Sequence, residues 1–437
     1  MHASAAHIAT ARAAPSARLA VPVAGFVAIA ATVAYGLTVG GAELGSASPP
    51  LLYRWRPDAG PFAVASIATL AAAVSLAPRL RAPTLSPRRF AAAAIALGLC
   101  LRLGLAVGRD GIEGLYGVYT APGFEGASEY LPALPALGLG TKPFLDTFAE
   151  IGTSLPVNAV GHPPGLLLTL HALGIHTAEG MAALTIGVGA LSVALTYVLA
   201  RELLDEPGAR AATLLYAFAP SAVLGGATSA DAAYATLALA AAAALLARRQ
   251  GTPALGAAGF ALASFFSYAN LGIGAVAALL AARRDGLRRG IGLALGCAVA
   301  LVAFYGLLHL VTGFDPAGAV RSAESVYREG VASHRPYAFW VLGSPVAFLV
   351  AAGLPIAWLA LRSLGARENA AVALFAVLAV AALLGFTKAE TERIYLFLVP
   401  LACVAAAAAL PARHLPPTLA ALACQALATE LLFFTVW

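Results

Sequence analysis

The chain has 437 residues, of which 60% are hydrophobic and only 11% are charged, and its mean hydropathy is +0.84. An ordinary soluble domain carries about 25% charged residues, so this composition excludes a soluble protein and predicts a polytopic membrane protein. The net charge of +6 comes from arginines in short clusters between apolar blocks, with no basic face interleaved with aromatic residues, so nucleic-acid binding is not expected.

Apolar blocks of near membrane-spanning length follow one another along most of the chain. They consist of Ala, Leu, Val and Gly without strict alternation, which predicts an all-α protein rather than a membrane barrel. Three parts are expected: N-terminal transmembrane helices (1–107), an external loop with an interfacial helix (108–180) and a transmembrane bundle (181–437). The blocks are 19–40, 61–78, 90–107, 163–176, 181–200, 211–226, 231–247, 254–268, 271–282, 290–311, 338–361, 370–387, 394–410 and 415–435.

The N-terminal segment is basic as far as Arg18, and an apolar run from Leu19 to about Gly40 follows. This run exceeds the roughly 7–15 residues of a signal-peptide core, which favours an uncleaved first span over a cleaved signal. The cysteines all lie inside apolar blocks, so neither a CxxC metal site nor a loop disulfide is expected. They are Cys100, Cys297, Cys403 and Cys424.

The arginines predict the orientation of a multi-pass protein in the cell membrane. Arg12 and Arg18 precede the first span, and more arginines follow the second, so the N-terminus is expected in the cytoplasm. If the short block 163–176 crosses, four later arginine clusters fall outside; if it does not, they fall inside. We therefore expect this block to be an interfacial or re-entrant helix, with about thirteen spans in total and an external C-terminus. The clusters are Arg248–Arg249, Arg283–Arg284, Arg288–Arg289 and Arg362 with Arg367.

The stretch 109–165 has no long apolar block and holds six of the 21 acidic residues. It is rich in Leu, Tyr, Phe and Pro, which argues against disorder, and an irregular connection of this length is usually functional. We expect an ordered catalytic loop on the outer face. The predicted topology places three further polar segments on that face: 228–231, 312–337 and 388–393. The last is basic despite lying outside, which a bound anionic group would explain.

Motifs in these segments occur in a characteristic order. Glu129-Tyr130 precedes Gly138 and Gly140, then Pro143-Phe144 with Asp146, then His162-Pro163-Pro164; later Lys388 precedes Arg393-Ile394-Tyr395 and Pro400. This arrangement resembles the GT-C membrane glycosyltransferases, namely the protein O-mannosyltransferase-like and aminoarabinose-transferase-like members and uncharacterised actinobacterial membrane glycosyltransferases. The resemblance touches roughly residues 125–400. Many members have Asp where this chain has Glu129.

The resemblance implies a GT-C-like fold and transfer of a hexosyl or pentosyl group from a polyprenyl-phosphate donor to a glycan, lipid or protein acceptor. A carboxylate within hydrogen-bond reach acts as general base on the acceptor hydroxyl, and Lys or Arg stabilises the leaving phosphate. A divalent cation, Mg²⁺ or Mn²⁺, on Glu129 and Asp146 is an open alternative to metal-free catalysis. The catalytic candidates are Glu129, Asp146, His162 and Asp110, and the donor-phosphate candidates are Lys388, Arg393, Tyr395 and Arg335.

Each candidate also has a purely structural interpretation. Glu129 and Asp146 are also explained as ordinary solvated acids of a loop, and Asp110 is also explained as an acid at the membrane interface. His162 precedes Pro163, a favoured first helical residue, and is equally well explained as a cap or a packed side chain.

Lys388 and Arg393 are also explained as cations that snorkel at the end of a span. Asp231 opens a span, and a carboxylate favoured there by the helix dipole is the simpler interpretation. Arg102 lies inside an apolar block, where a charge suggests function, although it is also placed to snorkel toward Asp110.

Two other functions compete with a glycosyltransferase. A transporter or flippase for lipid-linked sugars usually carries charges at the membrane midplane and paired repeats, whereas here the acids cluster in one loop and no short repeat is evident. The other alternative is a non-catalytic protein of cell-envelope assembly. Transfer of a radiolabelled sugar, as against its movement across vesicles, separates these functions.

Overall fold

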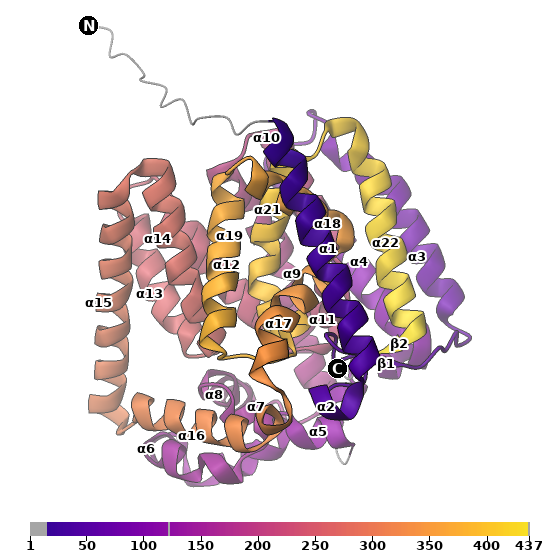
Figure 1. Ribbon diagram of the computed structural model, residues 1–437. Coiled ribbons are helices and arrows are strands. Elements are labelled where there is room, and N and C mark those ends of the chain that lie inside the picture. Colours follow the sequence, from indigo (N-terminus) through magenta and orange to yellow (C-terminus); the bar gives the residue numbers. More distant parts are fainter. Residues whose placement is uncertain (1–14, 121–122, 436–437) are drawn as a thin grey trace, which may run out of the picture.

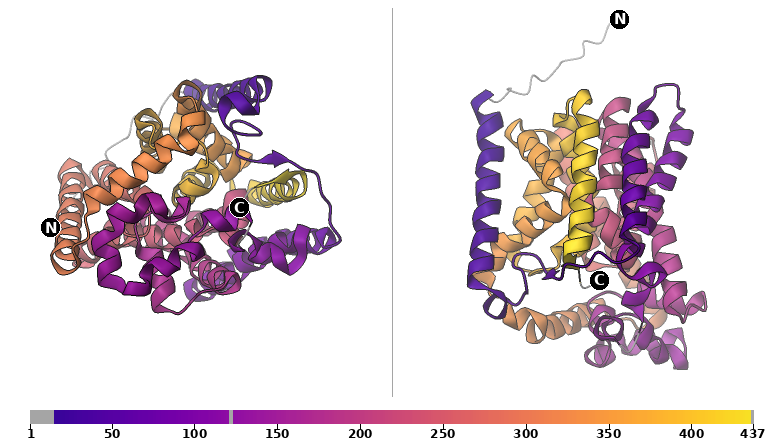
Figure 2. Two further views of the ribbon diagram at one scale, coloured as in Figure 1. Left: turned by 90° about the horizontal axis from the view of Figure 1, so that it is seen from below. Right: turned by 90° about the vertical axis from the view of Figure 1, so that its right-hand side faces the viewer.

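The apolar runs form α-helices in the computed structural model, which describes residues 15–120 and 123–435 (Figure 1). Most of these helices lie side by side in one bundle, as both views in Figure 2 show. The predicted all-α class is confirmed. The bundle contains α1 (Pro15–Val39), α3 (Ala63–Leu76), α4 (Pro87–Asp110), α9 (Ala178–Leu203), α10 (Glu206–Phe218), α11 (Pro220–Thr228), α12 (Asp231–Leu246), α13 (Thr252–Ser264), α14 (Leu271–Asp285), α15 (Leu287–Thr312), α17 (Tyr337–Ala352), α18 (Leu354–Gly365), α19 (Asn369–Leu384), α21 (Val399–Ala409) and α22 (Leu415–Leu432).

A layer of short helices covers one end of the bundle, at the bottom of Figure 1. The stretch expected to be an irregular loop is ordered, as predicted, but it is built from short helices that frequent Pro and Gly residues interrupt. The layer contains α2 (Gly41–Leu44), α5 (Phe124–Ser128), α6 (Thr141–Ile151), α7 (Val157–Val160), α8 (Gly165–Ala172), α16 (Pro316–Glu329) and α20 (Thr391–Ile394), and strands β1 (Arg54–Trp55) and β2 (Phe433–Phe434) pair antiparallel beside it.

Short polar side chains start several of the longer helices. Ser86, Thr177, Asp205 and Asp315 each accept a hydrogen bond from a backbone N–H in the first turn of the helix that follows. This satisfies a donor that has no partner within the helix, a contribution of about 1 kcal/mol at each site. The sequence thus defines where the helices begin even though the apolar composition varies little.

The covering layer has an aromatic core of its own. Phe144 and Phe148 of α6 lie with ring centroids 5.5 Å apart, and Phe148 lies 6.0 Å from Phe314, which follows α15. All three rings are almost fully buried. Aromatic pairs at these separations stabilise by about 0.5–1.5 kcal/mol beyond the area they bury. The layer is therefore fixed to the bundle through α6 and the end of α15.

The arginine clusters lie together at the opposite end of the bundle. Arg210 donates to the backbone oxygens of Ala82 and Leu85, and Arg284 donates to those of Glu202 and Leu246. Arg283 bonds to the 367–369 connection, and Arg81 bonds to Ala412. Clusters that the sequence analysis assigned to one side are thus joined at one end, while the acid-rich segment lies at the other. Arg12 lies outside the described residues.

The block expected at 163–176 is reduced to α8, which has eight residues. At 1.5 Å per residue this helix is about 12 Å long, far less than the roughly 30 Å of a bilayer core. The backbone N–H of Gly165 bonds to the oxygen of Phe265, which holds the start of α8 against the end of α13. The expectation that this block does not cross agrees with its length.

Within the described residues, seven helices are long and apolar enough to cross a membrane, or up to nine if each of two bent pairs counts as one span. This is compatible with a membrane protein but does not support the expected count of about thirteen spans. The apolar side chains that α15 exposes, such as Leu295, Val299 and Val302, suit contact with lipid.

Two blocks that the apolar pattern predicts as single spans are bent. The axes of α10 and α11 differ by 56° at Pro220, and those of α17 and α18 differ by 115° at Gly353. Pro220 has no N–H to continue the helical ladder, and Gly353 has a φ of 118°, which side chains of L-residues rarely adopt. Because the residues on both sides of each bend are apolar, the hydropathy pattern does not reveal either bend.

Candidate functional site

The loop between α19 and α21 is held in a strained conformation at the covered end of the bundle. Ala389 and Glu390 both have positive φ, 65° and 59°, although neither is glycine. Residues of this kind in the left-handed region cost roughly 1–3 kcal/mol each and cluster at functional sites. The surrounding contacts must supply that energy, so this loop is a candidate functional element.

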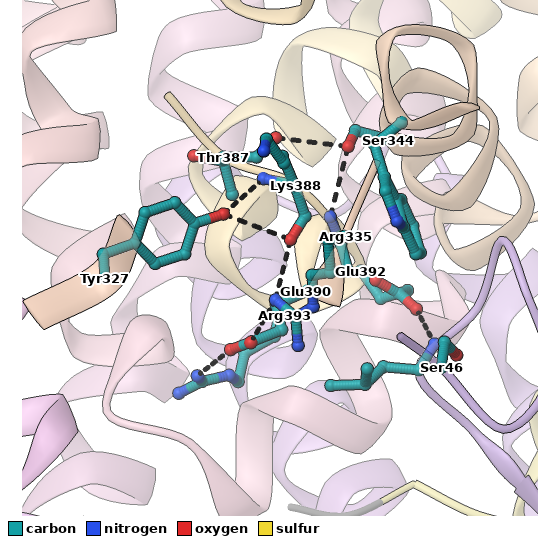
Figure 3. Close-up of polar contacts among 12 residues, drawn as sticks. Ser46, Tyr327, Arg335, Ser344, Thr387, Lys388, Glu390, Glu392 and Arg393 are labelled. Atoms are coloured by element: carbon teal, nitrogen blue, oxygen red, sulfur yellow. Dashed lines mark hydrogen bonds and ion pairs between the residues drawn. The ribbon is translucent and has the colours of Figure 1, made fainter. Parts of the chain in front are cut away.

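Contacts from two neighbouring helices fix this loop, as Figure 3 shows. The hydroxyl of Ser344 on α17 donates to the oxygen of Thr387 at 3.2 Å and accepts from the N–H of Ala389 at 3.3 Å. The hydroxyl of Tyr327 on α16 accepts from the N–H of Lys388 at 2.6 Å. The loop backbone is thus tied to both the bundle and the covering layer.

The loop contributes to a buried chain of alternating charges. Arg393 Nη1 lies 3.2 Å from Asp231 Oδ2, and its Nη2 lies 3.1 Å from Glu390 Oε2. The other oxygen of Glu390 lies 2.9 Å from Arg335 Nη1. Burial raises the pKa of Glu390, but the guanidinium groups of Arg393 and Arg335 outweigh that effect and hold the pKa below its usual value. The Glu390 carboxylate therefore stays ionised between the two guanidinium groups.

Asp231 is the first residue of α12, and the Ser229 hydroxyl donates to its Oδ2 at 2.7 Å. Its side chain is buried, which a merely dipole-favoured surface acid would not be. The helix dipole alone therefore does not explain Asp231, which also forms part of the buried chain of charges. The only signal in the sequence was that Asp231 opens a span at the same end as the acid-rich stretch.

Glu129 caps the C-terminal end of α5 and is only 5% exposed. Its Oε1 accepts a hydrogen bond from Asn158 Nδ2 at 2.8 Å, whereas its Oε2 is buried and has no hydrogen-bond partner among the described residues. Burial raises its pKa to about 7, although Arg393 opposes the rise and Asp231 adds to it. Glu129 is thus a carboxyl group that exchanges its proton near neutral pH.

His162 lies beside this group, with its ring centroid 5.9 Å from that of Tyr130 and 5.3 Å from that of Tyr234. Its Nδ1 is 2.9 Å from the backbone oxygen of Asn158, so Nδ1 carries the proton and donates. Burial lowers the pKa of His162, against the opposing charge of Asp231, so the ring is neutral. The neutral ring leaves Nε2 as an acceptor.

A cavity of about 1020 Å³ opens at this end of the bundle. Its walls come from the segment 41–54, the end of α4, the turns that follow, α11 and strand β2. Asp110 and Arg335, two of the predicted site residues, line it, and so do Glu125 and Gly126, which precede Glu129. Within the described residues this is a space large enough for a sugar headgroup, since ligand pockets usually measure about 300–1,000 Å³.

The other candidates are placed less favourably for catalysis. Asp146 is exposed on α6 beside Gly313 and makes no hydrogen bond or ion pair with a described residue. The Lys388 ammonium donates to the oxygen of Ala332 at 3.4 Å, and the Tyr395 ring is buried against Phe348 and Phe397. The structure therefore brings together Glu129, His162, Arg393 and Arg335, with Asp110 at the cavity, but does not join Asp146 to them.

The described side chains form no cluster of the kind that usually holds a divalent cation. In residues 15–120 and 123–435, no group of three or more His, Cys, Asp or Glu side chains has the arrangement of a metal site. Asp231 and Glu390 are already paired with arginine, and Asp146 does not contact Glu129. Glu129 and Asp146 therefore do not form the shared site for Mg²⁺ or Mn²⁺ that the sequence left open.

Comparison of the chain with protein-family models, curated proteins and solved structures gave no significant match.

Proposed function

We propose that this chain is a GT-C-like glycosyltransferase of the cell membrane, which moves a sugar from a polyprenyl-phosphate donor in the cavity to an acceptor whose hydroxyl reaches Glu129, three residues beyond the cavity-lining Gly126. The observation that carries the proposal is the environment of Glu129. This carboxyl group is buried, has a pKa near 7 and carries one oxygen without a partner in the described part of the chain. A general base is most effective when its pKa lies near the working pH.

In the proposed reaction Glu129 takes the proton of the acceptor hydroxyl. The hydroxyl oxygen forms a bond to the anomeric carbon of the donor sugar, and the bond from that carbon to the phosphate oxygen breaks. The phosphate leaves with the electron pair, and the product has inverted configuration. The neutral His162 packs against the ring of Tyr130, the residue that follows Glu129, and both His162 and Glu129 are hydrogen-bonded to Asn158.

Arg335 is the best placed residue to stabilise the leaving phosphate. It lies at the end of the buried charge chain and lines the cavity, whereas Arg393 pairs with two carboxylates behind it. A guanidinium offers two parallel donors to phosphate oxygens. In this proposal Arg393 and Lys388 support the site through Glu390 and the loop backbone rather than by contact with the donor.

The proposal includes the topology expected from the arginines, with the cavity on the outer face and the N-terminus in the cytoplasm. Nine spans become thirteen if α12, α13, α14 and α19 also cross. These helices have 13–16 residues and are about 20–24 Å long, so crossing requires local thinning of the bilayer.

One observation favours a flippase as the second candidate. Broken helices are common in transporters, and the bends at Pro220 and Gly353 interrupt two apolar blocks. In this alternative the cavity would accept a lipid-linked sugar without transferring it. The buried, unpartnered oxygen of Glu129 has no role in such a mechanism, which is why we rank it second.

The test is transfer by purified, reconstituted protein from radiolabelled polyprenyl-phosphate hexoses and pentoses to acceptors in a membrane extract. We expect Glu129→Gln to reduce transfer by about 10²–10⁴-fold. Glu150→Gln, which removes an exposed carboxylate from α6, is the matched control and should remain active. Movement of the donor across vesicles without transfer would support the flippase, and neither activity would support a non-catalytic assembly protein.

A further inference from the structure

The cavity carries more charge than the proposed reaction uses. Four carboxylates line it, and none makes an ion pair with a described residue: Asp110, Glu113, Glu125 and Glu430. Two arginines besides Arg335 line it, Arg54 on β1 and Arg109 near the end of α4. Unpaired carboxylates in a concave site favour a ligand with a positive group.

Arg109 provides a complementary, buried donor. It is only 8% exposed, and its Nη2 donates to the backbone oxygens of Glu430 and Phe433. Its Nη1 is buried and has no hydrogen-bond partner among the described residues, although the side chain forms part of the cavity wall. A buried donor without a partner is costly, so an anionic oxygen that reached Nη1 through the cavity wall would stabilise it.

Exposed apolar side chains border the lining residues. Trp55 follows Arg54, Ile112 lies between Asp110 and Glu113 in the sequence, and the Phe62 ring packs against Gly111; their side chains are 60%, 70% and 48% exposed. These residues lie where α4 ends, and aromatic side chains of this kind favour the level of lipid headgroups. A ligand with acyl chains could therefore reach the cavity from the bilayer.

We propose that this cavity binds the headgroup of an aminophospholipid. Its phosphate is held by Arg109 Nη1 with Arg54, and its primary ammonium is held by Asp110 and Glu113, while the acyl chains pass Trp55 and Phe62. A phosphate alone would leave the carboxylates unpaired, whereas an ammonium adds three donors and a compensating charge. The inference goes beyond the proposed transfer, because it concerns binding alone.

The experiment measures binding of phosphatidylethanolamine, phosphatidylcholine and phosphatidylglycerol with identical acyl chains to the purified, delipidated protein without donor. We expect phosphatidylethanolamine to bind about tenfold more tightly than the other two, because only its headgroup carries a positive charge that also donates hydrogen bonds. The double variant Asp110→Asn/Glu113→Gln should lose this preference, and Arg54→Ala should weaken all three lipids. Glu150→Gln/Glu324→Gln, which neutralises two exposed acids of the covering layer outside the cavity, is the control and should keep the preference.

Equal or tighter binding of phosphatidylglycerol would overturn the proposal, since it would indicate a site for phosphate alone. A preference for phosphatidylethanolamine that survives in Asp110→Asn/Glu113→Gln, with the variant monodisperse, would overturn it too. Because no sugar donor is present, these outcomes concern lipid binding alone, and the proposed enzymatic function is tested separately by the transfer experiment.

Discussion

Asp231, the first residue of α12, and Arg393, in the short helix α20, form an ion pair of 3.2 Å in which both side chains are at least nine-tenths buried. The pair joins two segments far apart in the sequence. It also lies within electrostatic reach of Glu129, since both charges affect the pKa of that carboxyl group. The pair therefore links the stability of the loop to the protonation of the proposed base.

The first prediction concerns the removal of one partner. Asp231→Asn should lower the free energy of unfolding by about 3–5 kcal/mol, because Arg393 would lose a buried counter-charge. It should also lower the pKa of Glu129, because the charge of Asp231 raises that pKa while the charge of Arg393 lowers it. Denaturation in detergent measures the first effect, and the pH dependence of transfer measures the second.

A double-mutant cycle provides the control for this prediction. Arg393→Met alone should also destabilise, and the double variant should be less destabilised than the sum of the two single variants. Additive effects would show that the two side chains do not interact, contrary to the geometry.

The second prediction concerns pH. Burial raises the pKa of Glu129 from its usual 4.5 to about 7, so the folded protein holds this proton more tightly than the unfolded chain does. The resulting stabilisation is complete below pH 4.5 and is lost as the pH rises through about 7. By linkage it amounts to at most about 3 kcal/mol. Stability of Glu129→Gln should lack this component, and an identical pH profile for variant and wild type would contradict the shifted pKa.

The third prediction concerns the loop that carries Glu390. Ser344→Ala removes the hydroxyl that bonds to Thr387 and Ala389, which leaves two loop backbone groups without that partner at a cost of about 1–3 kcal/mol. Hydrogen exchange at residues 387–391 should become faster. Ser363→Ala is the matched control, because its hydroxyl is equally buried but bonds to Ala405. It should lower stability without faster exchange in the loop, and equal exchange in both variants would reject the role of Ser344.

Features that depend on local composition could be predicted from the sequence. Helical class follows from uninterrupted apolar runs, and the block 163–176, which contains α8, is too short to cross. The gathering of arginine clusters at one end follows from their positions between apolar blocks.

Features that depend on contacts between distant segments could not be predicted in this way. The partner of Arg393 is Asp231, and nothing local to either residue identifies the other. The cavity wall includes β2, which pairs with β1 from the other end of the chain. Asp146 follows Glu129 closely in the sequence, yet the 3₁₀ turn at Leu131–Leu139 and the start of α6 place it on an exposed surface, away from the buried Glu129.

The fourth prediction follows from that placement. Asp146→Asn should change the free energy of unfolding by no more than about 0.5 kcal/mol, because the side chain is exposed and makes no ion pair with a described residue. Transfer should stay within about twofold of wild type, in contrast to the loss expected for Glu129→Gln. A dead Asp146→Asn variant that is folded and monodisperse would place Asp146 in the site after all.

The last prediction concerns the side of the membrane on which the cavity opens. A cysteine at Asp231 would not report this, because that position is buried. Arg321 and Arg288 are both exposed. Arg321 is on α16 in the covering layer (Figure 1), whereas Arg288 is in the first turn of α15, which reaches that layer only at its other end, so Arg321→Cys and Arg288→Cys form a matched pair. In a background without the four native cysteines, a membrane-impermeant maleimide on intact cells should label position 321 at once and position 288 only after permeabilisation, as the positive-inside rule requires. The reverse pattern would place the cavity in the cytoplasm, and labelling of both positions on intact cells would contradict a bundle that crosses the membrane between them.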